Sequence, residues 1–400
     1  MSNCAVVGIN WGDEGKGRMV DLLTEDFDIV VRYQGGGNAG HTVINEYGKF
    51  ALHLLPSGIF RPGVVNVLGP GVALDLQSLW EEIELLRANG VYITPENLMI
   101  SERAGLLLPW HKEQDALEER RLGAHKYGST GQGIAPFYSD KYQKKTLQAG
   151  DLAYPAQLRE RLAGLLEWKN LILTRVYGAP GHELGEIEAW LEKYGAPLRP
   201  YIRDTGRFLS GTSAAGKGIL FEAQLGALRD LEQGICPYTT SSNTLAAYAL
   251  MGGGPLAGSL DEVVGVVKAY STCVGEGPFV CEWSGPEAEA LREAGSNTAR
   301  RQAGPGASGP STSWRRATAC AFRARPASLS PSSTCSATWI RYPSASPTRW
   351  TAPRRATSPS PPRLRGQSPS SNTWTAGAAT SPKPENGPTC PLRRGATCGA

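Results

Sequence analysis

The chain has few of the residues that form metal sites or disulfide frameworks. Its 8 cysteines are scattered without a C-x-x-C pair, and only 5 histidines occur among 400 residues. This pattern argues against a zinc site and favours a reducing, cytoplasmic environment. No apolar run reaches the length of a membrane span, and the N-terminus lacks the features of a secretory signal. A formal net charge of +4 gives no sign that the whole chain binds nucleic acid or a membrane.

Acidic and aliphatic residues nearly vanish after Gly295. From residue 296 to 400 there is no Asp, Glu385 is the lone carboxylate side chain, and Ser, Pro, Arg, Thr and Ala dominate. Such a segment cannot bury enough apolar surface to offset the entropy of ordering its chain. We therefore predict a globular domain over residues 1–295 and a low-complexity, largely disordered tail over residues 296–400.

Before that break, short apolar runs alternate with segments of helical periodicity, which is typical of an α/β fold. The expected strands are Cys4–Val7, Ile29–Tyr33, Phe50–Leu55, Val64–Gly69, Leu98–Ser101 and Gly218–Glu222. The expected helices are Asp75–Arg87, Trp110–Leu122, Leu158–Trp168 and Glu183–Tyr194, with another beginning near Met19. The stretch Gly123–Lys145 is expected to be a loop.

A glycine-rich stretch, G-I-N-W-G-D-E-G-K-G-R over Gly8–Arg18, joins the first strand to the first helix. Such a turn presents backbone N–H groups beside the positive end of a helix dipole, which makes an anion site. Lys16 adds a positive charge for phosphate oxygens. The carboxylate of Asp13 would repel an anion unless it binds Mg²⁺ or takes a proton from the substrate. The standard P-loop pattern fits poorly because Gly17 stands where Ser or Thr is expected, so a ligand-free turn is the competing interpretation.

A second glycine loop follows the second strand and reads Q-G-G-G-N-A-G-H-T over Gln34–Thr42. Because loops after parallel strands meet at one edge of a sheet, we expect both loops to face one crevice. His41 is then placed to donate or accept a proton near neutral pH, although a lone histidine is also an ordinary polar loop residue.

Two further polar stretches have the composition of binding loops. Gly128–Gly133 reads G-S-T-G-Q-G, and Tyr238–Thr244 reads Y-T-T-S-S-N-T. An ordinary surface loop would explain the first, and a helix N-cap would explain Ser242 or Asn243 in the second. An N-cap does not explain so many hydroxyl groups together.

Several of these strings resemble the motifs of adenylosuccinate synthetases, in family order. W-G-D-E-G-K-G resembles the nucleotide loop, and R-Y-Q-G-G-G-N-A-G-H-T resembles the second conserved loop. The stretch from Gly128 to Lys145 resembles G-T-T-G-x-G-I-x-P-x-Y-x-D-K, and P-Y-T-T-S-S-N-T and K-A-Y-S-T-C-V-G-E-G-P-F resemble later motifs. The resemblance covers almost everything up to Gly295.

The resemblance implies a GTP-dependent ligase that joins IMP and L-aspartate to give adenylosuccinate, GDP and phosphate, the first committed step from IMP to AMP. It implies a P-loop-NTPase-like α/β fold with a mainly parallel central sheet and peripheral helices, a Mg²⁺ cofactor and a homodimer in the cytoplasm. No membrane and no specific nucleic acid partner is expected.

The resemblance also implies roles for individual residues. Asp13 and His41 are the expected catalytic pair, with Asp13 and the Gly40 carbonyl as the expected Mg²⁺ ligands. The expected GTP-binding residues are Gly12, Asp13, Glu14, Gly15, Lys16, Gly17, Arg18, Gly40, His41 and Thr42. The expected IMP-binding residues are Asp13, Glu14, Gly15, Lys16, Asn38, Ala39, Gly40, His41, Thr130, Lys144, Gln224 and Thr240.

Two of these assignments depart from the family pattern. Lys144 stands where the family has an Arg that reaches the IMP of the other subunit, and Lys keeps the charge but not the bidentate fork. The family reads F-E-G-A-Q-G where this chain reads F-E-A-Q-L-G, so the IMP-oriented Gln is carried to Gln224 with a one-residue slip.

After Gly295 the family's aspartate loop and its guanine-binding L-T-K-L-D are absent. Both reappear in one shifted reading frame. The codons of Asn297–Gly304 then permit E-Y-G-A-A-T-G-R, and those of Pro331–Cys335 permit T-K-L-D-V. We interpret this as a frameshift near Gly295. Because the 400-residue chain lacks both motifs, we expect no adenylosuccinate formation from it and ready activity from the frame-corrected chain. The alternatives to the enzyme are therefore a catalytically inactive fragment that binds IMP or phosphate, which we favour for the chain as it stands, and a nucleic-acid-binding protein acting through a basic tail.

Overall fold

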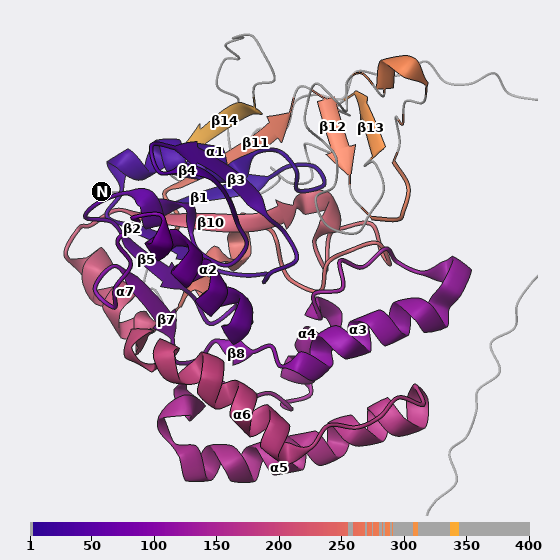
Figure 1. Cartoon of the computed structure of the whole chain (residues 1–400). Helices are drawn as coiled ribbons and strands as arrows, with labels where there is room; N and C mark the ends of the chain where they lie inside the picture. Colours follow the sequence, from indigo (N-terminus) through magenta and orange to yellow (C-terminus); the bar gives the residue numbers. More distant parts are fainter. Residues whose placement is uncertain are drawn as a thin grey trace, which may run out of the picture. The chain divides into compact units, whose positions relative to one another are not determined.

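The computed structural model describes residues 3–254, 259–268, 270–273, 275–279, 282, 285–288, 290, 307–310 and 337–343 (Figure 1). The chain divides into two compact units, residues 1–348 and 349–400, and the second lies outside the described residues. The predicted boundary at Gly295 therefore stays a prediction. The predicted disorder of residues 296–400 concerns mostly residues that the structure does not describe. Two segments of this tail, Ala307–Pro310 and Ala337–Pro343, are strands.

An eight-stranded sheet forms the centre of the first unit, in the order β14-β11-β1-β10-β2-β5-β7-β9. All neighbours pair in parallel except β14, which is antiparallel to β11. This confirms the mainly parallel central sheet. The strands are β1 Asn3–Gly8, β2 Ile29–Arg32, β5 Val65–Leu68, β7 Leu98–Ser101, β9 Ile202–Arg203, β10 Ile219–Gly226, β11 Glu262–Lys268 and β14 Ala337–Pro343.

Strand order decides which loops meet. Strand β10 lies between β1 and β2 and runs parallel to both. The carboxyl ends of these three strands therefore lie at one edge of the sheet, and the two glycine loops leave from that edge together with the end of β10. The expectation that both loops face the same side is confirmed.

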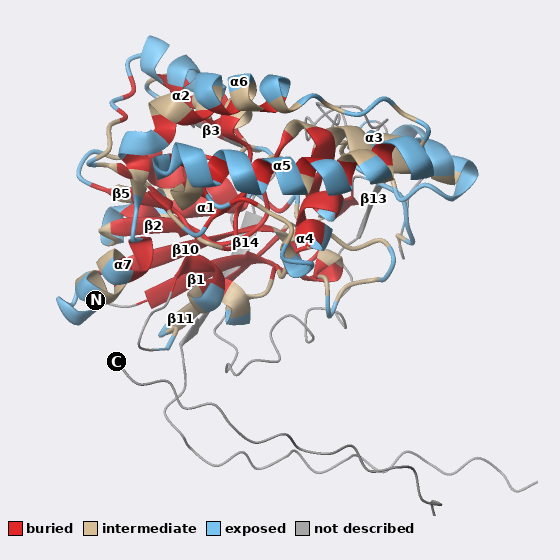
Figure 2. Cartoon of the chain, turned by 90° about the horizontal axis from the view of Figure 1, so that it is seen from below, coloured by how far each residue is buried: buried red, intermediate tan, exposed pale blue. Residues whose placement is uncertain are grey.

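Helices cover the sheet, and their buried sides face it while their outer sides are exposed (Figure 2). The α-helices are α1 Lys16–Leu23, α2 Leu76–Ala88, α3 Pro109–Leu122, α4 Ile134–Tyr142, α5 Pro155–Leu171, α6 Leu184–Gly195, α7 Thr205–Ala214 and α8 Ala249–Gly253. One core cluster joins α2, α5 and α6 to β7, and includes Leu79, Ile83, Leu162, Leu191 and Ile100. The helical periodicity predicted these packing faces correctly.

Two expectations about local structure are wrong, and one helix was not expected. The segment Gly123–Lys145 is not one loop, because α4 occupies its second half. Helix α7 was not expected, since its two glycines and its hydroxyl residues have low helix propensity. It is stabilised by the Asp204 side chain, which accepts the Arg207 N–H, and by burial of Leu209.

The second wrong expectation concerns the strand Phe50–Leu55, which comes after the second glycine loop. His41–Asn45 forms strand β3, which pairs with β4 Gly48–Leu52 in a hairpin separate from the central sheet. The expected strand Phe50–Leu55 therefore ends early and does not join that sheet. The other small sheets pair β6 Ala73–Leu74 with β8 Gly105–Leu106, and β12 Tyr270–Cys273 with β13 Ala307–Pro310.

A buried polar cluster joins α3, α4 and α5. His111 Nε2 lies 3.0 Å from Asp140 Oδ2, and Lys169 Nζ lies 2.8 Å from the same oxygen. Burial lowers the pKa of His111, and its contact with Asp140 opposes that shift. Removing one member of such a cluster would leave a buried charge without its partner, so the cluster fixes α4 against the two longer helices.

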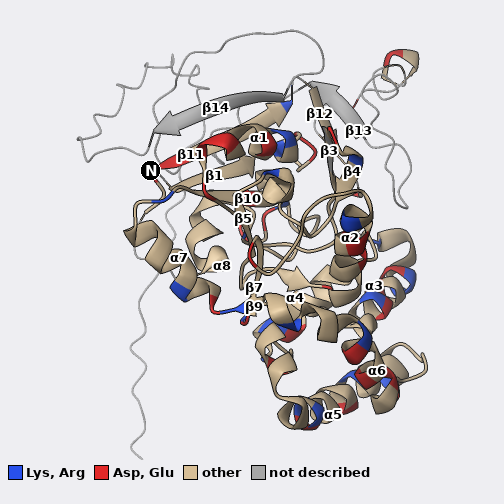
Figure 3. Ribbon diagram, turned by 60° about the vertical axis from the view of Figure 1, so that its left-hand side comes forward, with Lys and Arg blue, Asp and Glu red and all other residues tan. Residues whose placement is uncertain are grey.

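Acidic and basic residues are mixed along the outer helices α3, α5 and α6 (Figure 3). Within the described residues, no helix is both long enough and apolar enough to cross a membrane.

Candidate functional site

The first glycine loop is held closed by one carboxylate and one ammonium group. Glu14 accepts hydrogen bonds from the N–H groups of Asn10 at 3.1 Å and Gly12 at 2.7 Å. Lys16 Nζ donates to Glu14 Oε2 and to the Gly12 carbonyl, each at 3.0 Å. Helix α1 begins at Lys16, and no side chain caps its N-terminus. The helix end and the lysine together have the character of an anion site, while Glu14 keeps the loop in shape.

The second glycine loop is fixed to the end of β10 by the amide of Gln224. Its Oε1 accepts the Gly36 N–H at 2.9 Å, and its Nε2 donates to the carbonyls of Gly36 at 2.6 Å and Ala39 at 3.2 Å. Gly35 has φ 77°, and a Cβ there would collide with the Gln224 side chain. Gln224 therefore braces the segment that carries Asn38 and Gly40, and its predicted contact with IMP stays a prediction.

His41 brings the two loops together. A Cβ placed on Gly17 of the first loop would lie 2.5 Å from His41 Cδ2, so the imidazole lies directly against that glycine. Asp13 is four residues earlier in the same loop. The two loops that carry Asp13 and His41 are therefore in contact, and the catalytic roles of these two residues stay a prediction.

Two buried residues surround the imidazole. His41 Nε2 lies 2.9 Å from Ser57 Oγ and 3.5 Å from Glu222 Oε1. Burial lowers the pKa of His41 to about 4, Glu222 opposes that shift, and the positive charges of Arg32 and Lys16 add to it. In the absence of ligand the imidazole is therefore neutral at physiological pH.

Asp13 is half-exposed at the mouth of the first loop. Its Oδ2 accepts hydrogen bonds from Lys268 Nζ at 2.9 Å and Thr272 Oγ1 at 2.6 Å. These partners come from β11 and β12, so three segments converge on one carboxylate. The lysine ammonium occupies a position where a cation is favoured.

The residues present fit a magnesium ion that is held by only one or two protein groups, together with substrate phosphates and water. Within the described part of the chain, no group of three or more His, Cys, Asp or Glu side chains could hold a metal ion. Mg²⁺ in nucleotide sites is usually held by one or two protein groups, substrate phosphates and water. Asp13, which already attracts a cationic side chain, suits that role. A metal site built from protein ligands alone is not supported among these residues.

Carboxylates of α3 shape the third glycine loop, which is the stretch Gly128–Gly133. Glu119 accepts the N–H groups of Tyr127, Gly128 and Ser129, each at 3.0 Å. Asp115 Oδ2 accepts the Ser129 hydroxyl and the Gly133 N–H, each at 2.8 Å. The loop that carries Thr130 is therefore pinned at both ends by one helix.

Helix α4 connects this third loop to the second glycine loop. The Tyr138 hydroxyl accepts the Gly35 N–H at 3.1 Å and donates to the Gly71 carbonyl at 2.7 Å. A Cβ on Gly37 would lie 3.4 Å from Gln132 Oε1 of the third loop. All three glycine loops therefore belong to one continuous site.

The hydroxyl-rich stretch reaches the same site through Gln34. Ser242 Oγ donates to Gln34 Oε1 at 2.9 Å, and Gln34 Nε2 donates to the Gln224 carbonyl at 2.6 Å. Thr240 Oγ1 is buried and has no hydrogen-bond partner among the described residues. A buried hydroxyl without a partner is costly, so it suits a group that binds a ligand.

Two residues that were predicted to bind IMP or GTP, Lys144 and Arg18, lie apart from the residues described above. Lys144 is exposed just beyond the C-terminal end of α4. The third glycine loop lies at the N-terminal end of the same helix. The helix has nine residues, so at a rise of 1.5 Å per residue its two ends are about 13 Å apart. Lys144 has φ 63°, which is uncommon for a residue other than glycine. Arg18 is exposed on α1. Thr42 lies in β3, and its side chain lies outside the described residues.

Sequence reasoning assigned no role to several side chains that build the site. These are Gln34, Ser57, Asp115, Glu119, Glu222, Lys268 and Thr272. Glu222 carried a usable signal, because an acidic residue in a buried strand needs a partner. The other residues lie in segments that only the tertiary fold brings together, so their sequence positions gave no signal.

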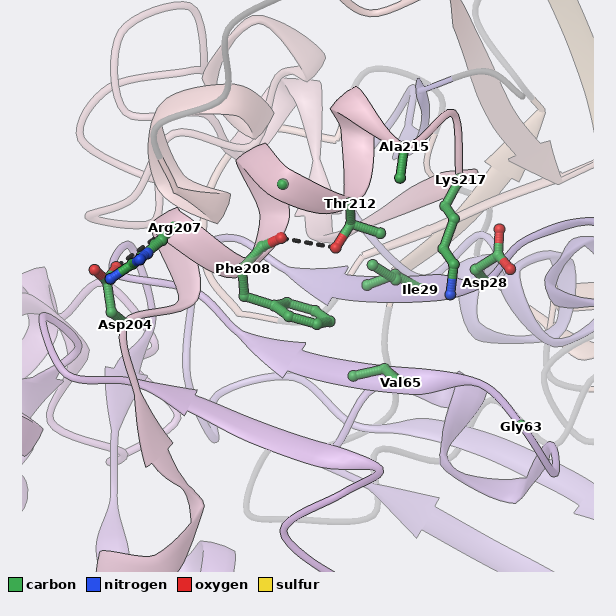
Figure 4. Close-up of a pocket in the computed structure, with 11 residues that line it drawn as sticks. Asp28, Ile29, Gly63, Val65, Asp204, Arg207, Phe208, Thr212, Ala215 and Lys217 are labelled. Carbon is green, nitrogen blue, oxygen red and sulfur yellow. Dashed lines mark hydrogen bonds between the residues drawn. The ribbon is translucent and has the colours of Figure 1, made fainter.

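A cavity of about 630 Å³ lies elsewhere, between α7 and the sheet (Figure 4). Ile29, Val65 and Phe208 line it, and Asp28 and Lys217 lie at its rim. Asp28 precedes β2 and Lys217 precedes β10, so this cavity is at the amino ends of the strands. The glycine loops occupy the other edge.

The sequence profile described as adenylosuccinate synthetase matches residues 5–304. The chain belongs to the adenylosuccinate synthetase family. The adenylosuccinate synthetase of Clostridium acetobutylicum is 43% identical over 295 residues, which is 74% of this chain and 69% of that protein. The enzyme of Magnetococcus marinus is 45% identical over 296 residues, covering 74% of this chain and 68% of that one.

Solved structures agree with this assignment. The fully ligated adenylosuccinate synthetase of Plasmodium falciparum has a TM-score of 0.72 at 32% identity, covering 78% of this chain and 72% of that chain. The succinoaminodeoxyadenylate synthetase of cyanophage S-2L, at 22% identity and a TM-score of 0.55, shows the shared fold alone. Adenylosuccinate synthetases are ligases of purine biosynthesis, in the branch to AMP. These likenesses favour the synthetase function over the inactive fragment that the sequence left open.

Proposed function

We propose that the three loops form the site at which this chain joins IMP and L-aspartate, with GTP converted to GDP and phosphate. The observation that carries the proposal is the contact of His41 with Gly17, which brings an imidazole to the loop that carries Asp13. Phosphoryl transfer to a purine oxygen uses a base that activates the attacking oxygen and a side chain that stabilises the transferring group, both beside an anion site.

Each residue of the pair has one task in the proposed reaction. Asp13 removes the N1 proton of IMP, so that O6 attacks the γ-phosphorus of GTP and GDP leaves. His41 stabilises the transferring phosphoryl group. The amine of aspartate then attacks C6 and displaces that group as inorganic phosphate. The Lys16 ammonium group and the N-terminus of α1 bind phosphate oxygens.

Asp13 and the Gly40 carbonyl are the proposed ligands of Mg²⁺, which would neutralise charge on the β- and γ-phosphates when bound. The GTP-binding set predicted from the sequence is retained in full as part of the proposal. Asn38, Thr130, Gln224 and Thr240 are the proposed IMP contacts, and the unpartnered Thr240 hydroxyl supports its place among them.

The proposal extends to the assembly and its location. The exposed Lys144 reaches the IMP of a second copy in a homodimer, which accords with its position far from its own third loop. The protein works in the cytoplasm.

The test is adenylosuccinate formation by the full chain, followed by chromatography, with IMP, GTP and aspartate each omitted in turn. We expect product only with all three substrates. Asp13→Asn and His41→Asn should each lower kcat by about 10²–10⁴-fold, as expected for loss of a general acid or base. Glu160→Gln, on the exposed side of α5, is the control and should leave the rate unchanged. Product formation that survives both loop substitutions would reject the proposal.

A further inference from the structure

The guanidinium group of Arg229 joins several segments around the hydroxyl-rich stretch Tyr238–Thr244. Arg229 ends a short 3₁₀ helix that follows β10. Its Nη1 donates to the Tyr238 carbonyl, and its Nη2 donates to Cys273 Sγ at 2.8 Å. Both terminal nitrogens also donate to the Glu276 carbonyl, at 3.3 Å and 3.4 Å. One side chain therefore connects the end of β10, the hydroxyl-rich stretch and the chain at and beyond β12.

Arg229 and its neighbour Asp230 hold the hydroxyl-rich stretch at both ends. The Arg229 carbonyl accepts the Thr240 N–H at 2.7 Å. The buried Asp230 accepts, through Oδ2, the Thr244 N–H at 2.6 Å and the Thr244 hydroxyl at 3.3 Å. Thr240, which carries the buried hydroxyl described above, therefore lies between two anchors that adjacent residues supply.

The third glycine loop is reached through Glu276. The Glu276 N–H donates to the Tyr127 carbonyl at 3.3 Å, directly before that loop. A Cβ on Gly128 would lie 2.6 Å from the Glu276 nitrogen, and a Cβ on Gly277 would lie 2.5 Å from Tyr238 Cγ. The segment around Glu276 is therefore packed against both the third glycine loop and the hydroxyl-rich stretch, and the guanidinium group binds it from a third side.

We infer that Arg229 is a positioning residue that sets the affinity for IMP, because it holds together the two loops that carry Thr130 and Thr240. Loops that are already in place do not have to be ordered when the ligand binds, and this strengthens binding. The planar fork of an arginine suits the task, since its N–H groups reach several carbonyl acceptors at once. The inference rests on the proposed function, in which Thr130 and Thr240 contact IMP.

Two substitutions separate the fork from its charge. Arg229→Met keeps most of the apolar stem and removes every donor, whereas Arg229→Lys keeps the positive charge and loses the planar fork. We expect each to weaken IMP binding at least about tenfold. We expect kcat and the KM for GTP to change less than about threefold, because neither loop carries a proposed GTP contact.

The first measurement is isothermal titration of IMP into the full chain, without GTP or aspartate. The matched control is Arg199→Met, which removes an exposed arginine whose partner is the exposed Glu192, and it should keep the wild-type Kd. An unchanged Kd in Arg229→Met would overturn the inference. Wild-type affinity in Arg229→Lys would overturn it as well, since the positive charge alone would then account for the effect. A lower kcat with the Kd for IMP kept would contradict the role.

Amide hydrogen exchange, read by mass spectrometry without ligand, tests the positioning itself. In Arg229→Met we expect faster exchange in the peptides that contain Thr240 and Glu276, and unchanged exchange in β1 and β2. Equal exchange of those two peptides in both proteins would overturn the inference. If exchange in β1 and β2 shows that Arg229→Met is unfolded, Arg229→Lys decides by the same two measurements.

Neither measurement needs turnover, so the inference and the proposed function can fail separately. A chain that makes no adenylosuccinate, yet loses affinity for IMP when Arg229 is replaced, would reject the proposed function and keep this inference. A chain that makes adenylosuccinate, with equal IMP affinity in Arg229→Met, would do the opposite. A wild-type chain that binds no IMP would reject both.

Discussion

At the scale of single residues, the site depends on glycines whose missing side chains make room for other loops. Gly17 leaves space for the His41 ring, and Gly35 leaves space for the Gln224 amide. Both pairs join segments that are distant in the sequence. These glycines therefore have a second role besides exposing backbone N–H groups to a phosphate. They allow neighbouring loops to come into contact.

Replacing Gly17 by alanine tests this contact. Alanine is the better helix former, so α1 should persist, but the added Cβ would lie 2.5 Å from His41 Cδ2 and displace the ring. We expect kcat to fall at least about tenfold with the circular dichroism spectrum unchanged.

The matched control is Gly164→Ala in α5, where an added Cβ meets nothing within 4 Å. That substitution should raise the free energy of unfolding by about 0.4–1 kcal/mol and leave kcat unchanged. Equal kcat values for the two glycine variants would refute the contact's role.

At the scale of elements, α2 holds the segment that follows β4. Glu82 accepts the N–H groups of His53 at 2.8 Å, Leu54 at 3.0 Å and Leu55 at 3.4 Å. Burial raises the pKa of Glu82 to about 7, and the three backbone hydrogen bonds and the charge of Arg32 oppose that shift. Helix α2 therefore positions the segment that leads to Ser57 through the carboxylate of Glu82. The negative charge of this carboxylate is unfavourable because the side chain is buried.

This pKa predicts how stability changes with pH. The folded state binds the Glu82 proton more tightly than the unfolded state, whose value is the ordinary 4.5. The contribution of this group to stability is thus complete below pH 4.5 and is lost as the pH rises to about 7. In urea unfolding, the stability of the wild type minus that of Glu82→Gln should fall by roughly 1–3 kcal/mol across this window. Parallel curves for the two proteins would contradict the assignment.

The elements that the sequence predicted best are those with a local pattern. The buried strands and the helices α2, α3, α5 and α6 follow from apolar periodicity, and the motif strings identify the glycine loops. The hairpin of β3 with β4 and helix α7 escaped prediction because tertiary contacts stabilise them. The contact between Ser57 and Glu222 escaped prediction for the same reason, since the two residues are 165 positions apart in the sequence and only the fold brings them together.

At the scale of the whole molecule, the match to the family ends near the change in composition. The profile stops at residue 304, and the chain covers 69% of the Clostridium acetobutylicum enzyme. The frameshift interpretation places the lost aspartate loop and guanine contacts after this point. The hypothesis of a nucleic-acid-binding tail concerns residues that lie mostly outside the description, and it stays untested.

Restoring the reading frame after Gly295 is the corresponding prediction. The restored chain regains the motifs that the family uses for aspartate and guanine, so we expect it to form adenylosuccinate at least about tenfold faster than the 400-residue chain. Purified chains compared under identical substrate concentrations provide the measurement. Equal rates would show that the sequence after Gly295 supplies nothing to catalysis.

The most direct test of one shared phosphoryl-transfer site follows an oxygen atom. IMP labelled with ¹⁸O at position 6 is given to the full chain, with the frame-restored chain in parallel, and the released inorganic phosphate is analysed by mass spectrometry. If Asp13 activates O6 to attack the γ-phosphate beside His41, the released phosphate carries the ¹⁸O. Adenylosuccinate formed together with unlabelled phosphate would contradict the account.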